Sequence, residues 1–250
     1  MTVPTKSLLE SALVFLGESL RSFRSGSLTF AILHVTTAVE LVLKERLARV
    51  HANLIFKNLD SEKLDRSKTV GLYELPFRLS HFGVQTSESE LATIRDVAKW
   101  RNEIVHHTPT YERNSAIARL GEVYNFLASF LVQQLKVDLK SVISADLYKT
   151  ASELLLEWKG VIAQARDRAT KSGETQRSET CPACGAAGVL TEHADGTVQC
   201  HLCGETLKAE TCGICDKPAL GHPGWDDQIY HDDCLADYAA DYFAEIRRNR

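Results

Sequence analysis

The chain has 250 residues, of which 44% are hydrophobic and 25% charged, a composition typical of a soluble globular protein. This length suits one medium domain and one small domain. No apolar run approaches the ~18 residues that a membrane span needs, and the first residues lack the basic and apolar regions of a signal peptide. We therefore expect a cytoplasmic protein without a membrane partner.

Charge is distributed unevenly along the chain. Residues 171–250 contain 7 Lys and Arg against 14 Asp and Glu, a net charge of −7. The preceding residues contain the other 22 basic and 19 acidic side chains, a net charge of +3. Because an acidic surface repels a phosphate backbone, the C-terminal part is expected to contact protein, or to pack against the basic part.

Apolar residues recur at helical spacing through most of the first 170 residues. Ser25-Gly26-Ser27 separates the first two helices, and Pro109 stops a later one. Almost no alternation of period two occurs before residue 180, so we predict an all-α domain, an up-and-down bundle. The expected helices cover residues 5–24, 28–50, 72–81, 87–107, 113–137 and 145–170.

A polar, glycine-bearing stretch follows the helical part. Residues 171–180 are predicted to be a linker between a first domain, 1–170, and a second domain, 181–250. The second domain is short, contains glycines and carries its cysteines in pairs. We expect a hairpin near Asp195-Gly196 and a closing helix over about residues 233–247.

Seven cysteines and one histidine form four pairs with the same two-residue gap. A spacer of 15 residues separates the first pair from the second, and again the third from the fourth, with eight residues between the two units. Reduced thiols in such pairs are typical metal ligands, and two pairs complete a tetrahedron. The predicted ligands are Cys181, Cys184, Cys200, Cys203, Cys212, Cys215, His231 and Cys234.

A thiolate-rich ligand set fits zinc or an iron–sulfur cluster. Zinc is favoured because the second set contains a histidine and the spacing is that of zinc ribbons. We predict two structural zinc ions, since four protein ligands leave no position for water or substrate. Short spacers favour sequential pairing, with a cross-braced pairing as the alternative. His201 or His222 could replace His231, which has the better spacing.

The two units differ in the fold they suggest. The first, residues 181–207, resembles a plain zinc ribbon. The second, residues 210–250, resembles a treble clef, in which the start of a helix supplies two ligands. Together they form a small double-zinc module, which depends on its metals for folding energy because it has little core of its own.

A second candidate site lies at the C-terminal end of a predicted helix. Asn102 and His106 are four residues apart and share a helix face, and the long side chain of Arg101 can reach the same opening. A helix C-terminus favours a charged imidazole. Since guanidinium binds phosphate and imidazole transfers protons near neutral pH, this cluster suits a phosphodiester substrate.

The pattern of Arg101, polar Asn102, three further residues and His106 matches the R-x4-6-H motif of the HEPN superfamily. Residues 5–140 resemble this family, with Glu40 and Lys44 on the second helix. The resemblance implies a HEPN-like helical bundle. It also implies a metal-independent endoribonuclease that acts as a homodimer, in toxin–antitoxin pairs, antiviral defence or RNA-targeting CRISPR effectors.

The resemblance also implies roles for individual residues. Arg101 and His106 are the expected catalytic pair, Asn102 orients them, and Glu40 supports them. RNA is then cleaved by attack of its 2′-OH on the adjacent phosphate, and the zinc module regulates or targets the enzyme, or binds a regulatory protein. Thr108 stands where the toxin branch often has a tyrosine, and His107 is interpreted as a neighbour.

Three other interpretations stay open. R-x4-H is common in helices, so Arg101 can belong to a solvated face and His106 to a helix cap. The protein can be a non-catalytic adaptor that works through its acidic zinc module. A zinc-dependent regulator that binds nucleic acid is disfavoured by the acidity of that module and by the lack of a basic recognition helix. Trp and Tyr residues are interpreted as core, including Trp158.

Overall fold

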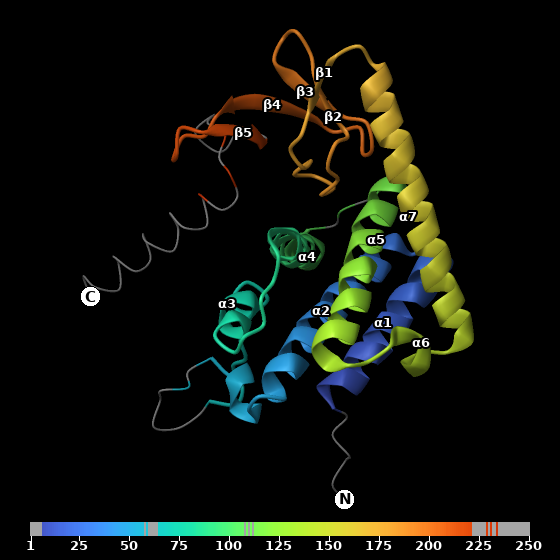
Figure 1. Ribbon diagram of the computed structural model, residues 1–250, viewed down its shortest axis with the longest axis vertical. Helices are drawn as coiled ribbons and strands as arrows, with labels where there is room; N and C mark the ends of the chain where they lie inside the picture. The colour runs from blue at the N-terminus through green and yellow to red at the C-terminus, as the bar shows by residue number, and fades with distance from the viewer. Residues whose placement is uncertain are drawn as a thin grey trace, which may run out of the picture. The chain divides into compact units, whose positions relative to one another are not determined.

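The computed structural model describes residues 7–57, 59, 65–107, 109, 111, 113–221, 229, 231 and 234. The chain divides into two compact units, Met1–Gly160 and Val161–Arg250. The first is a helical bundle and the second contains a small sheet (Figure 1). The second unit also contains two groups of cysteine and histidine side chains. This confirms the predicted fold class. Within the described residues, no helix has the length and apolar composition to cross a membrane.

Helix α2 is the central element of the helical unit. It packs against α1, α3, α4 and α5, which explains why apolar residues cover more than one of its faces. The elements of this unit are α1 (Leu8–Arg24), α2 (Leu28–Ala48), η1 (Ala52–Ile55), α3 (Leu75–Ser80), α4 (Glu88–His106), α5 (Arg113–Phe130), η2 (Leu131–Leu135), α6 (Leu139–Val142) and α7 (Ala145–Lys171), the last of which contains the division between the units.

Two of these helices begin with the same capping motif. Ser7 and Ser87 each accept a hydrogen bond from the backbone N–H three residues on, and the glutamate there accepts one from the serine N–H. Such capping boxes satisfy donors that a helix start leaves unpaired. The helix predicted over 113–137 consists of two elements in the structure, since α5 continues directly into the π-helical turn η2. This turn ends at Lys136, which adopts a left-handed conformation with φ 58°.

Helices α5 and α7 approach closely at Gly121. A Cβ added there would overlap the Cβ and Cγ atoms of Trp158, whereas a Cβ at Gly160 meets nothing within 4 Å. We expect Gly121→Ala to lower the free energy of unfolding by ~1–3 kcal/mol through overpacking. Gly160→Ala, the matched control, should raise it by about 0.5–1 kcal/mol because alanine is the better helix former. Urea unfolding followed by circular dichroism tests both, and equal effects of the same sign would contradict the packing argument.

A buried carboxyl group joins α4 to α5. Glu122 Oε1 accepts a hydrogen bond of 3.0 Å from the Thr93 hydroxyl. Burial and, to a smaller extent, the nearby charge of Asp96 raise the pKa of Glu122 against the effect of that hydrogen bond, and the net result is a change from 4.5 to about 7. The folded state therefore holds this proton more tightly than the unfolded state does.

This pKa predicts how stability depends on pH. Because the pKa of Glu122 is higher in the folded state than in the unfolded state, proton binding by this carboxyl group stabilises the fold. This stabilisation is complete below about pH 4.5 and is lost as the pH rises through about 7. Glu122→Gln should therefore be more stable than the wild type at about pH 8, by up to ~3 kcal/mol, and should lose this advantage near pH 4.5. Unfolding free energies at several pH values test this, and a variant destabilised equally at every pH would contradict it.

The second unit contains a five-stranded antiparallel sheet in the order β1-β2-β3-β4-β5. Strand β1 lies inside the range 171–180 expected as a linker, and pairs with β2. The hairpin expected near Asp195-Gly196 joins β2 to β3, with Gly196 at φ 80°. Of the closing helix predicted over 233–247, only Cys234 lies among the described residues. The strands are Thr175–Arg177, Leu190–Glu192, Thr197–Cys200, Thr206–Thr211 and Pro218–Gly221.

Candidate metal centres and the end of helix α4

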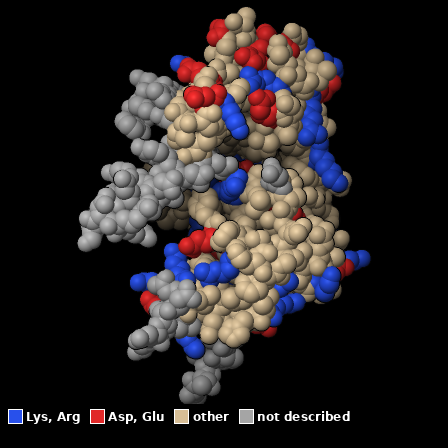
Figure 2. Space-filling model, turned by 60° about the vertical axis from the view of Figure 1, so that its left-hand side comes forward, with Lys and Arg blue, Asp and Glu red and all other residues tan. Residues whose placement is uncertain are grey.

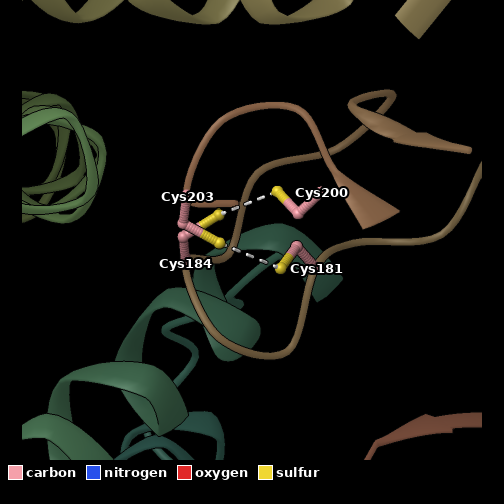
Figure 3. A group of neighbouring side chains, drawn as sticks. All are labelled: Cys181, Cys184, Cys200 and Cys203. Atoms are coloured by element: carbon pink, nitrogen blue, oxygen red, sulfur yellow. Dashed lines mark hydrogen bonds between the residues drawn. The ribbon is translucent and has the colours of Figure 1, made fainter. Parts of the chain in front are cut away.

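The first four cysteines form one compact group (Figure 3). The sulfur atoms of Cys181, Cys184, Cys200 and Cys203 all lie within 4.8 Å of one another. The Sγ atoms of Cys181 and Cys203 are 3.8 Å apart, as are those of Cys184 and Cys200. A tetrahedral ion with metal–sulfur bonds of ~2.3 Å requires sulfur separations of about 3.8 Å. The donor set and its size therefore fit a metal ion.

Each C-x2-C pair is shaped by the same turn. In the first, the Cys181 N–H donates to the carbonyl of Ala186, and the Gly185 N–H donates to the carbonyl of Cys181. The same two hydrogen bonds recur around Cys200 and Cys212. The residue after each pair has a positive φ, namely Gly185, Gly204 and Asp216. This turn directs both sulfur atoms of a pair to one side, which explains the two-residue gap.

Electrostatics within this group favour a thiolate. Hydrogen bonds from Cys181 and Cys184 lower the pKa of the Cys200 thiol well below its usual range. The backbone N–H of Leu202 also donates to the Cys200 sulfur, at 3.4 Å. Because the thiolate is the form that ligates a metal, these contacts favour the ligating form of Cys200, whereas hydrogen bonding with Cys181 and Cys200 raises the pKa of the Cys184 thiol.

The second group contains Cys212, Cys215, His231 and Cys234, again with ligand atoms within 4.8 Å of one another. The Nδ1 atom of His231 lies 3.4 Å from the Cys215 sulfur and 3.7 Å from the Cys234 sulfur. Its Nε2 atom lies 3.0 Å from the carbonyl oxygen of Pro218. A carbonyl only accepts, so Nε2 is the protonated nitrogen, and Nδ1 is left as the metal ligand.

The structure groups the pairs sequentially, first with second and third with fourth. His201 lies outside both groups, because its Nε2 atom is 2.9 Å from the Thr191 hydroxyl. The other alternative ligand, His222, lies outside the described residues. The end of α7 also holds the first group in place, through hydrogen bonds from Arg166 to the carbonyl of Ala187 and from Arg168 to the carbonyl of His201, at 3.0 and 2.7 Å.

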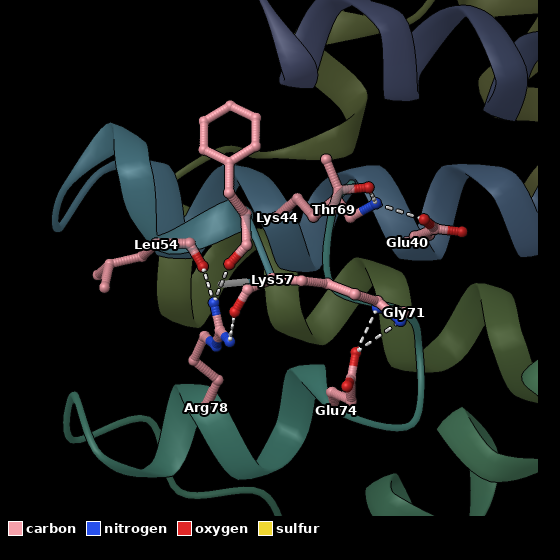
Figure 4. A network of polar contacts seen from close by, with 9 residues as sticks. Glu40, Lys44, Leu54, Lys57, Thr69, Gly71, Glu74 and Arg78 are labelled. Carbon is pink, nitrogen blue, oxygen red and sulfur yellow. Dashed lines mark hydrogen bonds and ion pairs between the residues drawn. The ribbon is translucent and has the colours of Figure 1, made fainter. Parts of the chain in front are cut away.

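In the helical unit, Glu40 on α2 links two cations. One carboxylate oxygen accepts from Lys44 and the other from Arg101 on α4. Lys44 also donates to the Thr69 hydroxyl at 2.9 Å (Figure 4). Lys44 and Glu40 side chains are only 7% and 15% exposed, whereas Arg101 is 42% exposed. The buried Glu40–Lys44 pair therefore fixes the position of the Arg101 guanidinium, part of which remains exposed to solvent.

The other predicted residues of this site lie at the surface. Asn102 is exposed one residue beyond Arg101, and His106 is the exposed last residue of α4. His107 is the C-cap, where the helical conformation ends. The segment beyond contacts α2, since the Thr29 hydroxyl lies 3.5 Å from the carbonyl of Pro109. Thr108 lies outside the described residues.

The sequence interpretation missed a cluster on the other side of α4. The Arg119 guanidinium lies between two aromatic rings, 4.8 Å from the centroid of Trp100 and 4.7 Å from that of Tyr111. Glu103 accepts from Arg119 at 3.5 Å and from the Tyr111 hydroxyl at 3.4 Å. Burial raises the pKa of Tyr111 to about 12, so the hydroxyl stays protonated. This cluster anchors the end of α4 to α5.

The residues at the end of α4 and the two metal groups differ in the chemistry that they can support. Arg101 offers a guanidinium to a phosphate, and His106 offers an imidazole that can exchange protons with bound substrate or solvent. The two metal groups are closed, with four protein ligands each, which suits a structural ion. In comparisons with known proteins, the chain matches no protein-family model, no curated protein and no solved structure.

Proposed function

We propose that this protein is a HEPN-type endoribonuclease that cleaves RNA without a catalytic metal. The observation that carries the proposal is the contact between Glu40 on α2 and Arg101 on α4. Glu40 leaves part of the guanidinium exposed, beside Asn102 and five residues, about 1.4 turns, before His106. A positioned arginine and a solvent-accessible imidazole on one helix end are the groups that phosphodiester cleavage requires.

In the proposed mechanism, His106 assists attack of a ribose 2′-OH on the adjacent phosphorus. Arg101 stabilises the negative charge that develops on the phosphate oxygens. The P–O5′ bond breaks, which leaves a 2′,3′-cyclic phosphate and a free 5′-OH. Glu40 acts as a positioning residue, since its contact restricts the rotamers of Arg101, and Asn102 orients the substrate or the catalytic pair.

We propose further that the active form is a homodimer of the helical unit. One Arg101–His106 pair supplies a single proton-transfer group, whereas the reaction needs a base for the 2′-OH and an acid for the leaving oxygen. Two apposed pairs provide both. Light scattering on the active protein gives its mass, and full activity from a monomer at micromolar concentration would contradict this arrangement.

We propose zinc as the metal of both centres. The second group contains an imidazole, and the sulfur separations of the first group match a zinc–thiolate tetrahedron. Bound zinc supplies folding energy to the second unit rather than a catalytic Lewis acid. The net charge of −7 over residues 171–250 suits a regulatory or targeting contact with a protein, and the proposed setting is a toxin or antiviral defence effector.

The deciding experiment is RNA cleavage by the purified chain, in the presence and absence of EDTA. Cleavage that persists briefly in EDTA and disappears in His106→Ala supports the proposal. A wild-type protein that leaves tRNA, rRNA and mRNA intact, even after removal of its second unit, would contradict it.

One observation favours a second candidate, a non-catalytic adaptor with the same helical fold. Arg101 is already engaged in an ion pair with Glu40, and the described residues include no hydrogen-bond partner that would orient the His106 imidazole. An adaptor would act through the acidic second unit. The cleavage assay separates the two candidates, because an adaptor leaves RNA intact at every enzyme concentration.

A further inference from the structure

A buried lysine beside the contact between Glu40 and Arg101 has no role in the mechanism described so far. Lys44 lies four residues after Glu40 on α2, and its side chain is almost fully buried. Figure 2 shows one face of the molecule, on which many Lys and Arg side chains reach the surface. Lysine is almost never buried unless it is paired. Because a buried ion pair often contributes no more stability than apolar side chains of similar volume, packing alone does not account for Lys44.

The ammonium group of Lys44 is held by two elements of the helical unit. It donates one hydrogen bond to Glu40 Oε1 on α2 and another to the Thr69 hydroxyl at 2.9 Å. Thr69 is itself fixed, since it forms a β-bridge with Phe56. The Arg78 guanidinium braces this bridge by donating to the carbonyl oxygen of Phe56 at 2.6 Å (Figure 4). The position of the buried positive charge is therefore set on both sides.

The three charged groups at this place carry one more positive charge than negative charge. The Glu40 carboxylate contacts both Lys44 and Arg101. Lys44 and Glu40 are buried, whereas Arg101 is partly exposed. The excess positive charge of this Lys44–Glu40–Arg101 cluster is therefore offered to solvent by Arg101. With a neutral side chain in place of Lys44, the carboxylate would cancel the charge of Arg101.

Arg101 also keeps hydrogen-bond donors for an anion. Its contact with Glu40 uses Nη1, and the described residues give the guanidinium no other hydrogen bond. A guanidinium has five N–H donors, and its planar arrangement suits two oxygens of one phosphate. The residues three and four positions from Arg101 on α4 are all uncharged, namely Val97, Ala98, Ile104 and Val105. No acidic side chain at this spacing on α4 competes with an anion.

We infer that Lys44 is a positioning residue that acts as a buried counter-cation. It compensates the charge of Glu40, so that this carboxylate orients Arg101 without cancelling its charge. Arg101 then binds a phosphate group of RNA through its exposed nitrogens. The inference rests on the proposed function for the identity of the anion, and it explains how an arginine in an ion pair still attracts a phosphate.

The salt dependence of RNA binding tests the inference, with fluorescence anisotropy of a short fluorescein-labelled single strand of mixed sequence. The full chain carries His106→Ala so that the probe stays intact. Arg101→Ala, the reference, should reduce the magnitude of the slope of log Kd against log salt concentration by about 0.7, the value of one phosphate contact on a single strand. Lys44→Met keeps the length of the side chain and removes its charge, and should give the same reduction. Lys149→Ala, an exposed lysine paired with Glu153 on α7, should leave the slope unchanged.

Three further variants separate the effect of charge from that of structure. Thr69→Val removes the hydrogen bond to Lys44 and keeps every charge, so the slope should equal that of the parent. Glu40→Gln removes the negative charge and should leave the slope at least as large. Glu40→Gln combined with Lys44→Met leaves Arg101 as the one charge of the cluster and should restore the parent slope. Circular dichroism checks the fold of each variant, and the two Glu40 variants keep the test decisive if Lys44→Met alone does not fold.

Inorganic phosphate is a second probe, which does not require that the chain binds RNA. The Nε–H signal of Arg101 in a ¹⁵N NMR spectrum, assigned with Arg101→Lys, should shift when phosphate is added to the parent or to Glu40→Gln. The signal should shift much less in Lys44→Met, because the remaining pair of Glu40 and Arg101 is neutral.

Three results would overturn the inference. A folded Lys44→Met variant keeps the parent slope, Glu40→Gln has a smaller slope, or phosphate leaves the Arg101 signal of the parent unchanged. These failures are distinct from failure of the proposed function. RNA cleavage by the wild type together with a parent slope in Lys44→Met refutes only the counter-cation. A phosphate response that depends on Lys44, in a chain that leaves RNA intact, refutes only the nuclease.

Discussion

Replacement of His106 by alanine is expected to reduce RNA cleavage by ~10²- to 10⁴-fold, the contribution typical of a positioned proton-transfer group. The side chain is exposed at the last residue of α4, so its removal should leave the melting temperature unchanged. Arg101→Ala should give a comparable loss, because the developing phosphate charge then lacks its cation. DNA of the same sequence should stay intact, since it has no 2′-OH nucleophile.

The matched control for this experiment is His107→Ala. His107 is also exposed, but it is the C-cap, where the helical conformation ends, and it lies one residue beyond the face that Asn102 and His106 share. Its replacement should change the rate much less. The rate is measured by gel analysis of a defined RNA, with zinc content and melting temperature determined on every variant. If His106→Ala still cuts RNA at the wild-type rate, the assignment of the active site is wrong.

Removal of a zinc ligand is expected to have the largest effect on stability. Elemental analysis of the wild-type protein should give two zinc ions per chain. Cys212→Ser and His231→Ala should each lose one of them, and Cys184→Ser should lose the other, with unfolding of the corresponding part of the second unit. Structural zinc contributes ~10–16 kcal/mol to such sites, far more than the small core of Cys212, Ala219 and Ile229 can supply.

His201→Ala provides the matched control in the second unit. This imidazole contacts Thr191 instead of a metal group, so the variant should retain both ions. The helical signal in circular dichroism should persist in all four variants, because α1–α5 lie in the other unit. A wild-type protein with one zinc, or with iron in place of zinc, would contradict the assignment of two zinc centres.

Local patterns predicted the helices with small errors. The start of α4 at Glu88 follows from the Ser87–Glu90 capping box, a signal contained in four residues. The end of α5 could not be predicted, since the apolar periodicity continues past Phe130 and the left-handed Lys136 carries no sequence signal of its own. Strand β1 was missed for a related reason: three polar residues show no alternation, and they pair only because β2 offers a free edge.

Some residues of the candidate sites could be predicted from the sequence, and others could not. The sequence places Arg101, Asn102 and His106 on one helix end and spaces the eight metal ligands in pairs, because both patterns depend on the fixed geometry of a single helix or turn. It also carries Glu40 and Lys44 four residues apart, a signal that could have identified Lys44 as the second partner of that carboxylate.

Other features were decided only by the tertiary structure. Glu40 and Arg101 are 61 residues apart, and their contact depends on how α2 packs against α4. The exposure of Tyr73 and Phe77 depends on Arg78, which binds carbonyl groups of a distant turn and so selects the face that α3 buries. Side chains of the same type become core or surface according to the orientation of their helix. Contacts distant in sequence set that orientation, and no short window of residues contains them.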